Sequence, residues 1–328
     1  MDQNRYNNGM KYCRCGYSGV LLPKVSLGFW HNFGEKTPYE TSRQIALYAF
    51  DHGVTHFDLA NNYGPQPGDA ERRLGRLLRE DLLGYRDELF ISTKAAYDMW
   101  EGPYGSWASR KHLMASLDQS LSRMGLDYVD LFYCHRYDPE TPLEESLQCL
   151  VDIVRSGKAL YIGISRWPLE ALKVAIPYLK ERDVPLLIYQ GRYNLLDREP
   201  ENEGILEYLS ENKIGFISFS PLAQGLLTDR YLNGIPAGSR MMEGRFLKKE
   251  DLNDTLLAQL HALNEMAQQR GETLAQMALA WILNHPATTS VLIGASSVDQ
   301  LEKNLCCMHS SPFYEDELIL IEDILSGR

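Results

Sequence analysis

Short apolar segments alternate with longer amphipathic segments along most of the chain. The short segments have the length of strands, and the longer ones repeat their apolar residues every three or four positions, as helices do. Strict alternation of strands and helices predicts a parallel sheet, and eight strands favour closure of that sheet into a barrel. The expected strands are Val25–Gly28, Thr55–Asp58, Leu89–Lys94, Val129–His135, Ala159–Ser165, Leu186–Gln190, Gly215–Ser220 and Ser290–Gly294.

Residues that suit helix termini flank several of the amphipathic segments. Pro142 and Pro168 lie where a first helical turn should start, and Gly53 and Gly125 lie where helices should end. The expected helices are Thr41–His52, Ala70–Glu80, Ser109–Met124, Leu143–Ser156, Leu169–Arg182, Ile205–Asn212, Leu256–Arg270, Thr273–Asn284 and Tyr314–Leu325.

Two further segments extend this pattern. Met10–Leu22 has the pattern of a short hairpin, whereas the stretch from Pro221 to about Asp254 is rich in Gly, Arg and Lys and weakly periodic. Such a long, aperiodic stretch is typical of a functional loop. Barrels of this kind reach ~250 residues or more as one unit. We therefore predict a single α/β domain over residues 1–328, a (β/α)8 TIM barrel with an N-terminal β-hairpin and extra loops and helices.

Composition and charge narrow the class of protein. The net charge of −11 disfavours a nucleic-acid partner, because such a partner needs a basic face. No apolar run approaches the ~18 residues that span a bilayer, and the polar first residues lack the apolar core of a secretory signal. The six cysteines lack the paired C-x2-C spacing of a zinc site. We expect a cytoplasmic protein with reduced thiols, no bound metal and no membrane insertion.

The ends of the expected strands carry an unusual mixture of side chains. Active sites of closed α/β barrels lie at the carboxyl ends of the strands. Asp, Lys, His, Ser and Gln converging on one rim are hard to explain as turn chemistry alone. The strands end at Gly28, Asp58, Lys94, His135, Ser165, Gln190, Ser220 and Gly294.

Asp58, Lys94 and Tyr63 form a candidate acid–base group. Asp58 would supply the counter-charge of Lys94, and Tyr63 follows Asp58 by five residues in a loop that faces the same rim. A cation beside a phenol favours the phenolate, so we expect a lowered pKa for Tyr63 and a role as general acid. An exposed turn tyrosine beside a structural ion pair is the alternative.

His135 ends the fourth expected strand. Alternation along a strand sends Cys134 and His135 to opposite sides, which argues against a Cys–His nucleophilic dyad. A histidine on the rim could hydrogen-bond a substrate carbonyl and orient it. A purely structural histidine is the alternative.

These residues, in this order, resemble the aldo-keto reductases. The segments that carry this resemblance are Gly53–Gly64 (GVTHFDLANNYG), Ile91–Lys94 (ISTK) and Leu131–His135 (LFYCH). The resemblance extends from about Met10 to Asn304. A narrower likeness points to the branch that holds voltage-gated potassium channel β subunits and bacterial L-glyceraldehyde 3-phosphate reductase. The segments that carry it are Gly105–Arg110 (GSWASR), Gly163–Ser165 (GIS), Ser220–Leu227 (SPLAQGLL) and Ile293–Ser296 (IGAS).

The resemblance implies NADPH-dependent reduction of small aldehydes or ketones. Tyr63 would donate the proton, Lys94 and Asp58 would tune its acidity, and His135 would orient the carbonyl for hydride attack. No G-x-G-x-x-G follows an expected strand, so a Rossmann mode is not indicated. The cofactor-binding residues that the resemblance implies are Trp30, Asp58, Ser165, Arg166, Gln190, Phe219, Ser220, Pro221, Leu222, Ala223, Gln224, Gly225, Arg230, Arg240, Gly294, Ser296, Gln300 and Asn304.

The loops of the rim supply substrate candidates. An aromatic wall with an arginine suits a small polar or phosphorylated aldehyde. Ordinary loop packing is the alternative for each residue. The candidates are Trp30, Asn62, Tyr63, Trp100, His135 and Arg136, with Tyr97, Trp107 and Tyr137 beside them.

Two positions depart from the family pattern. Lys303 stands beside Asn304 where relatives usually have a glutamate that contacts adenine, so either Glu302 takes its place or that contact is lost, and we expect weaker or differently balanced cofactor selection. Arg166 and Trp167 differ from the pattern of the bacterial reductase, so the substrate pocket should differ too.

Two other functions fit parts of this pattern. A channel-β-subunit-like protein that senses nicotinamide redox state would keep the cofactor site with little turnover, although those subunits have an asparagine in place of His135. A Schiff-base aldolase or isomerase would need a neutral Lys94, whereas Asp58 should keep it charged. Relatives form assemblies, so we also expect a homo-oligomer.

Overall fold

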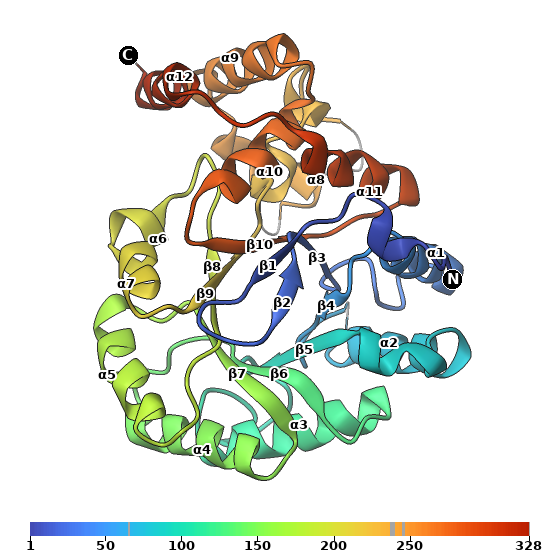
Figure 1. The fold of residues 1–328 in the computed structure, drawn as a ribbon, viewed down its shortest axis with the longest axis vertical. Coiled ribbons are helices and arrows are strands. Elements are labelled where there is room, and N and C mark those ends of the chain that lie inside the picture. Colours follow the sequence, from blue (N-terminus) through green and yellow to red (C-terminus); the bar gives the residue numbers. More distant parts are fainter. Residues whose placement is uncertain (65, 237–239, 245–246, 328) are drawn as a thin grey trace.

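The chain folds into a closed barrel of parallel strands surrounded by helices, as the alternating pattern predicts (Figure 1). The computed structural model describes residues 1–64, 66–236, 240–244 and 247–327. Within them, the strands close in the order β10-β3-β4-β5-β6-β7-β8-β9. The barrel strands are β3 (Val25–Gly28), β4 (His56–Asp58), β5 (Phe90–Ala95), β6 (Val129–Cys134), β7 (Ala159–Ser165), β8 (Ile188–Arg192), β9 (Gly215–Phe219) and β10 (Thr288–Ile293).

The expected strands match the observed ones to within two residues at each end, and the differences follow from pairing. Strand β8 begins at Ile188, where it pairs with Gly163, and continues to Arg192, which pairs with Phe219. His135 lies just beyond β6, but its backbone N–H still donates to the carbonyl oxygen of Ala95. His135 is therefore held by the ladder although it ends no strand.

The helices form an outer ring around the barrel (Figure 1). Ser109 caps α3 by accepting from the backbone N–H of His112, and Thr273 forms a capping box at α10. Pro142 and Pro168 occupy the N-cap positions, one residue before the first helical turn in which they were expected. The helices are α1 (Tyr39–Asp51), α2 (Asp69–Glu80), α3 (Arg110–Met124), α4 (Leu143–Arg155), α5 (Leu169–Lys180), α6 (Glu199–Asn202), α7 (Ile205–Glu211), α8 (Arg240–Glu243), α9 (Asp254–Gln269), α10 (Leu274–Asn284), α11 (Val298–Leu305) and α12 (Glu315–Ser326).

The expected hairpin covers one end of the barrel. Strands β1 (Tyr12–Arg14) and β2 (Leu21–Pro23) pair antiparallel and lie across the barrel mouth that faces the viewer in Figure 1. Cys15 and Leu22 are fully buried in a cluster with Tyr133 and other inward-facing strand residues. Since the backbone N–H of Tyr17 bonds to Lys213, just before β9, this is the amino-terminal end. Any catalytic chemistry is therefore left to the opposite, carboxyl-terminal end.

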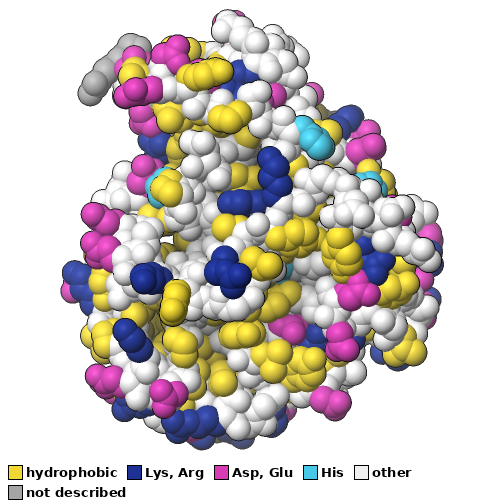
Figure 2. Space-filling model, viewed as in Figure 1, with side chains coloured by type: hydrophobic (Ala, Val, Ile, Leu, Met, Phe, Trp, Pro, Cys, Tyr) yellow, Lys and Arg dark blue, Asp and Glu magenta, His cyan; other side chains and the backbone are white. Residues whose placement is uncertain are grey.

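The closed end also shows how charge is distributed. Several Lys and Arg side chains lie near the middle of this face, with Asp and Glu side chains around its edge (Figure 2). The net charge of −11 is therefore spread unevenly over the surface.

Other structural features bear on the expected class of protein. None of the helices in the described part of the chain is long and apolar enough to cross a membrane. Within the same residues, no group of three or more His, Cys, Asp or Glu side chains could hold a metal ion. All six cysteines are free thiols.

Gly163 is a sharp test of barrel packing. A Cβ added there would meet two ring carbons of Tyr133 at 2.4 Å, and the Tyr133 ring is fully buried. We expect Gly163→Ala to lower the free energy of unfolding by about 1–3 kcal/mol, because overpacking forces side chains out of their rotamers. Urea denaturation measures this loss. The control is Gly84→Ala, where an added Cβ meets nothing within 4 Å. An equal loss in both variants would contradict the packing argument.

Candidate active site

A buried ion pair lies at the carboxyl ends of β4 and β5. Lys94 Nζ lies 2.5 Å from Asp58 Oδ2, 2.6 Å from the carbonyl oxygen of Leu59 and 3.5 Å from Tyr63 Oη. The side chains of Asp58 and Lys94 are both fully buried. The sequence-predicted trio therefore comes together in one hydrogen-bonded group.

The loop after β4 explains how Tyr63 reaches this group. Its backbone continues to bond to β5 beyond the strand, from the N–H of Leu59 to Ser92 and from the N–H of Asn61 to Lys94. A tight turn then follows, in which the N–H of Tyr63 donates to Ala60. This turn places the phenol over the ammonium group of Lys94.

Burial controls the acidity of Tyr63. The pKa of Tyr63 lies well above its ordinary value of 10.0, because burial and the negative charge of Asp58 both disfavour the phenolate. The expectation of a lowered pKa is therefore wrong, because Asp58 offsets the charge of Lys94. Burial also lowers the pKa of Lys94, against the opposing pull of Asp58. Tyr63 accordingly holds its proton, as a general acid must before it acts.

His135 faces the phenol. Its ring meets that of Tyr63 edge-on at 5.7 Å between centroids, and that of Tyr97 at 4.7 Å. The pKa of His135 lies well below 6.5, because burial and the cations Lys94, Arg166 and Arg136 disfavour its charged form. A neutral imidazole keeps one N–H, which can donate to a carbonyl oxygen.

Cys134 lies on the other side of β6. Its Sγ donates to the carbonyl oxygen of Arg136, and its side chain is buried in the core outside the barrel. The structure thus agrees with the expectation that Cys134 and His135 form no nucleophilic dyad.

A hydrogen-bonded chain behind Asp58 was not expected from the sequence. Ser92 Oγ donates to Asp58 Oδ1 at 2.6 Å, and His56 Nε2 lies 3.0 Å from Ser92 Oγ. His56 Nδ1 lies 2.8 Å from Ser26 Oγ, which lies 2.7 Å from Ser290 Oγ. The signal was available, because His56, Asp58, Ser92 and Lys94 are polar at every second position of two strands that line the barrel.

The direction of this chain follows from the charges. A carboxylate only accepts, so Ser92 donates to Asp58 and its oxygen is left to accept from His56 Nε2–H. Burial lowers the pKa of His56 to about 4, so the imidazole is neutral and its Nδ1 accepts from Ser26. The chain orients Asp58 Oδ1 and leaves Oδ2 for Lys94.

Several residues expected at the cofactor lie on the neighbouring strand ends. Ser165 and Gln190 are buried, and Gln190 Nε2 lies 3.3 Å from Asp58 Oδ1. The turn after β9 has left-handed backbone at Ser220 (φ 51), Ala223 (φ 46) and Gln224 (φ 60). Phe219, Pro221, Leu222 and Gly225 belong to this β9 end and turn.

The remaining cofactor candidates are spread over two regions. Ser297 caps the N-terminus of α11, just after Gly294, and Ser296 bonds to Gln300. Asn304 is buried, and its Nδ2 has no hydrogen-bond partner among the described residues. Arg230 is exposed, whereas the side chain of Arg240 lies outside the described residues. The carbonyl oxygen of Trp30 accepts from Gly64 N, which ties the loop after β3 to the loop of Tyr63.

The substrate candidates divide into two groups. Tyr97 contacts His135, and buried Asn62 Oδ1 has no partner among the described residues. Trp100 packs instead on His112 of α3, at 4.9 Å between ring centroids. Arg136 lies on the rings of Trp107 and Tyr97. Tyr97 thus contacts the catalytic group, and no described contact brings Trp100 to it.

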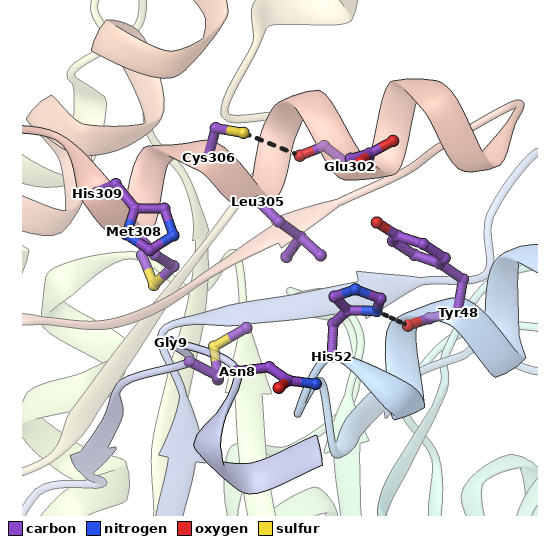
Figure 3. Close-up of a pocket in the computed structure, with 10 residues that line it drawn as sticks. Asn8, Gly9, Tyr48, His52, Glu302, Leu305, Cys306, Met308 and His309 are labelled. Atoms are coloured by element: carbon purple, nitrogen blue, oxygen red, sulfur yellow. Dashed lines mark hydrogen bonds between the residues drawn. The ribbon is translucent and has the colours of Figure 1, made fainter. Parts of the chain in front are cut away.

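A separate cavity of about 180 Å³ lies between α1, α11 and the N-terminal segment. Figure 3 shows Tyr48, His52, Glu302 and Cys306 around it. None of the four catalytic candidates lines this cavity, so it is distinct from the active site.

The chain is similar to enzymes and to channel subunits. The model of the aldo/keto reductase family matches residues 24–326. L-glyceraldehyde 3-phosphate reductase of Escherichia coli (strain K12) is 56% identical over 317 residues, which cover 95% of this chain and 92% of that protein. A probable voltage-gated potassium channel subunit beta of Arabidopsis thaliana is 35% identical over 325 residues, covering 97% and 98%. Its counterpart in Oryza sativa subsp. japonica is 33% identical over 324 residues.

Buried His56 predicts a loss of stability in mild acid. The folded protein keeps this imidazole neutral down to a pKa of about 4, whereas the unfolded chain takes up a proton near the ordinary value of 6.5. The free energy of unfolding should therefore fall as the pH drops from 6.5 towards about 4. This one group contributes up to ~1.4 kcal/mol per pH unit. Urea denaturation across this range measures the slope.

His56→Gln should remove that component of the slope. His135→Gln provides a second test, because the pKa of His135 is lowered in the same direction. Unchanged slopes in both variants would show that neither imidazole is held neutral by the fold.

Proposed function

Because the chain belongs to the aldo/keto reductase family, it is an NADP-dependent oxidoreductase, and we propose that it reduces small aldehydes and ketones to alcohols with NADPH. The observation that carries the proposal is the buried group of Asp58, Lys94 and Tyr63, with neutral His135 facing the phenol. These side chains supply an acid, a cation to stabilise the resulting anion, and a donor for the carbonyl.

Reduction of a carbonyl needs a hydride at carbon and a proton at oxygen, and NADPH supplies the hydride when bound. Tyr63 Oη gives its proton to the carbonyl oxygen as negative charge develops there. The ammonium group of Lys94, 3.5 Å away, then stabilises the phenolate. Asp58 holds this ammonium in place, and an N–H of His135 orients the carbonyl by a hydrogen bond. A proton from solvent restores Tyr63.

The residues at the carboxyl ends of the strands fit a nicotinamide dinucleotide. Ser165 and Gln190 would bind the carboxamide, Phe219 would pack on the ring, and the turn Ser220–Gly225 would wrap the pyrophosphate. The N-terminus of α11 suits a phosphate, and the buried Nδ2 of Asn304, which has no hydrogen-bond partner among the described residues, would donate to the cofactor. Trp30, Arg230 and Arg240 complete the proposed site, with Gly294, Ser296 and Gln300 at its adenosine end.

The substrate proposal is a small aldehyde similar to glyceraldehyde 3-phosphate or methylglyoxal. The name of the Escherichia coli relative gives L-glyceraldehyde 3-phosphate as that protein's substrate, and 95% of the present chain aligns with it. Tyr97 and the cations Arg136 and Arg166 beside His135 support a small polar or anionic ligand.

Two alternatives are less well supported. A redox-sensing regulatory protein would resemble the channel subunits, but they are 35% and 33% identical, against 56% for the reductase. A Schiff-base enzyme would need an unpaired Lys94, which here is bound to Asp58 and to a carbonyl oxygen.

We further propose a cytoplasmic homo-oligomer. Tyr314, just before α12, and Ile319 and Leu320 within it have exposed side chains that a second copy of the chain could cover.

Tyr63→Phe should abolish most of the turnover. Loss of the only proposed proton donor should lower kcat for methylglyoxal by roughly 10²–10⁴-fold, while NADPH still binds. NADPH oxidation in steady state measures the turnover, and quenching of protein fluorescence measures binding. Full-speed reduction by the folded variant would exclude Tyr63 as the acid. Absence of turnover in the wild type, with any aldehyde tested, would favour the sensor.

Lys303 tests the adenosine end of the cofactor site. Its ammonium lies 2.9 Å from Asp299, and both side chains are largely exposed, so it adds no acceptor for an adenine amino group. Glu302, the other residue that could supply the missing glutamate, instead lines the cavity on the α1 side, beside Tyr48. Lys303→Glu should therefore tighten NADPH binding by a few-fold, about the effect of one partly exposed hydrogen bond. Fluorescence titration measures the dissociation constant, and equal affinity of the two proteins would remove the idea.

A further inference from the structure

Two arginines near His135 differ in how far they are already engaged. Arg136 Nε donates to the carbonyl oxygen of Ala96 at 3.1 Å, and its Nη2 donates to Ser106 Oγ at 2.9 Å. Its guanidinium also lies 3.7 Å from the Trp107 ring centroid and 4.4 Å from that of Tyr97. Asp98 Oδ1 lies 3.8 Å from Arg136 Nη2. The N–H donors and the flat faces of the Arg136 guanidinium are therefore used to hold the loop between β5 and α3, which contains Ala96, Ser106 and Trp107.

Arg166 is much less engaged. Its side chain is exposed, and Nη1 donates to Tyr97 Oη at 3.4 Å. Within the described part of the chain, this is its one side-chain hydrogen bond, and no carboxylate pairs with it. This bond joins the guanidinium to Tyr97, whose ring packs on that of His135 with 4.7 Å between the centroids. Four of its five N–H donors therefore make no hydrogen bond within the described residues.

The backbone holds Arg166 in an uncommon conformation. Its φ of 57° lies in the left-handed region, which is strained for a bulky residue and persists only where the surroundings enforce it. The next residue, Trp167, is 1% exposed, and its carbonyl oxygen accepts from Tyr189 Oη. The N–H of Arg166 donates to Gln190. These anchors fix the base of the side chain and direct it towards Tyr97.

We propose that Arg166 determines substrate specificity by binding an anionic substituent, foremost a phosphate ester, on the end of the substrate away from the reacting carbonyl. The inference rests on the proposed reductase function. A guanidinium with free donors binds phosphate by paired, charge-assisted hydrogen bonds. Tyr97 contacts both Arg166 and His135, so the cation and the carbonyl-orienting imidazole share one wall. The family resemblance assigns Arg166 to the cofactor instead, and the experiment separates the two roles.

The test compares a phosphorylated with an uncharged substrate of the same carbon skeleton. We would measure kcat/KM for glyceraldehyde 3-phosphate and for glyceraldehyde in the wild type, Arg166→Gln and Arg166→Lys. The ratio of the two values should fall roughly 10- to 100-fold in Arg166→Gln, mainly through KM for the phosphate, and less in Arg166→Lys. The control is Arg192→Gln on the neighbouring strand, which removes the same charge from a guanidinium already paired with Asp197 at 2.9 Å. Its ratio should stay within about two-fold of the wild type, because a solvent-screened charge acts weakly.

Two results would overturn the proposal. An unchanged ratio in Arg166→Gln would show that the guanidinium does not contact the phosphate. A weaker NADPH dissociation constant, with both substrates affected alike, would assign Arg166 to the cofactor. Both results require an active wild-type enzyme. Failure of the reductase proposal would appear separately, as absence of turnover with either aldehyde before any substitution is made.

Discussion

The site depends on a charge pair buried inside the barrel. Removing a carboxylate and an ammonium from water costs several kcal/mol per ion, so such a pair persists only when its remaining hydrogen-bonding positions are filled. Here Ser92 and Gln190 donate to Asp58, while Lys94 also donates to the carbonyl oxygen of Leu59. Three parallel strands, β4, β5 and β8, supply these side chains, and Leu59 directly follows β4. Closure of the barrel therefore brings together the hydrogen-bonding groups that offset the cost of burying the ion pair.

The same closure explains why Tyr63, the proposed acid, keeps its proton. A cation next to a phenol would lower the pKa in water, but Asp58 neutralises Lys94 and burial penalises the phenolate. In the proposed reaction the balance would shift when negative charge develops on a bound carbonyl oxygen, because Tyr63 then gives up its proton and Lys94 stabilises the phenolate. A site with little charge to spare in the resting state thus keeps its electrostatic stabilisation for the transition state.

The surroundings of a polar side chain also decide its role elsewhere in the site. The hydrogen-bonded chain from Asp58 to Ser290 lies inside the barrel, and two arginines lie on its rim. Inside the barrel, neutral His56 and two serine hydroxyls orient one carboxylate oxygen without adding charge. On the rim, Arg136 is used to hold a loop, whereas Arg166 is positioned by a strained backbone and a buried tryptophan. Residues of one chemical type therefore have different roles, according to what already surrounds them.

The sequence by itself determined the barrel, most element positions and the set of candidate catalytic residues, because period-2 and period-3.6 patterns and strand ends are local features. Short α6 and α8 have too few residues for such a pattern, and Pro142 could not reveal whether it capped or began its helix. Only the tertiary structure decided the direction of the pKa shift of Tyr63, the chain through His56 and the difference between Arg136 and Arg166. Each of these depends on burial and on partners from other strands and loops, which the order of residues does not specify.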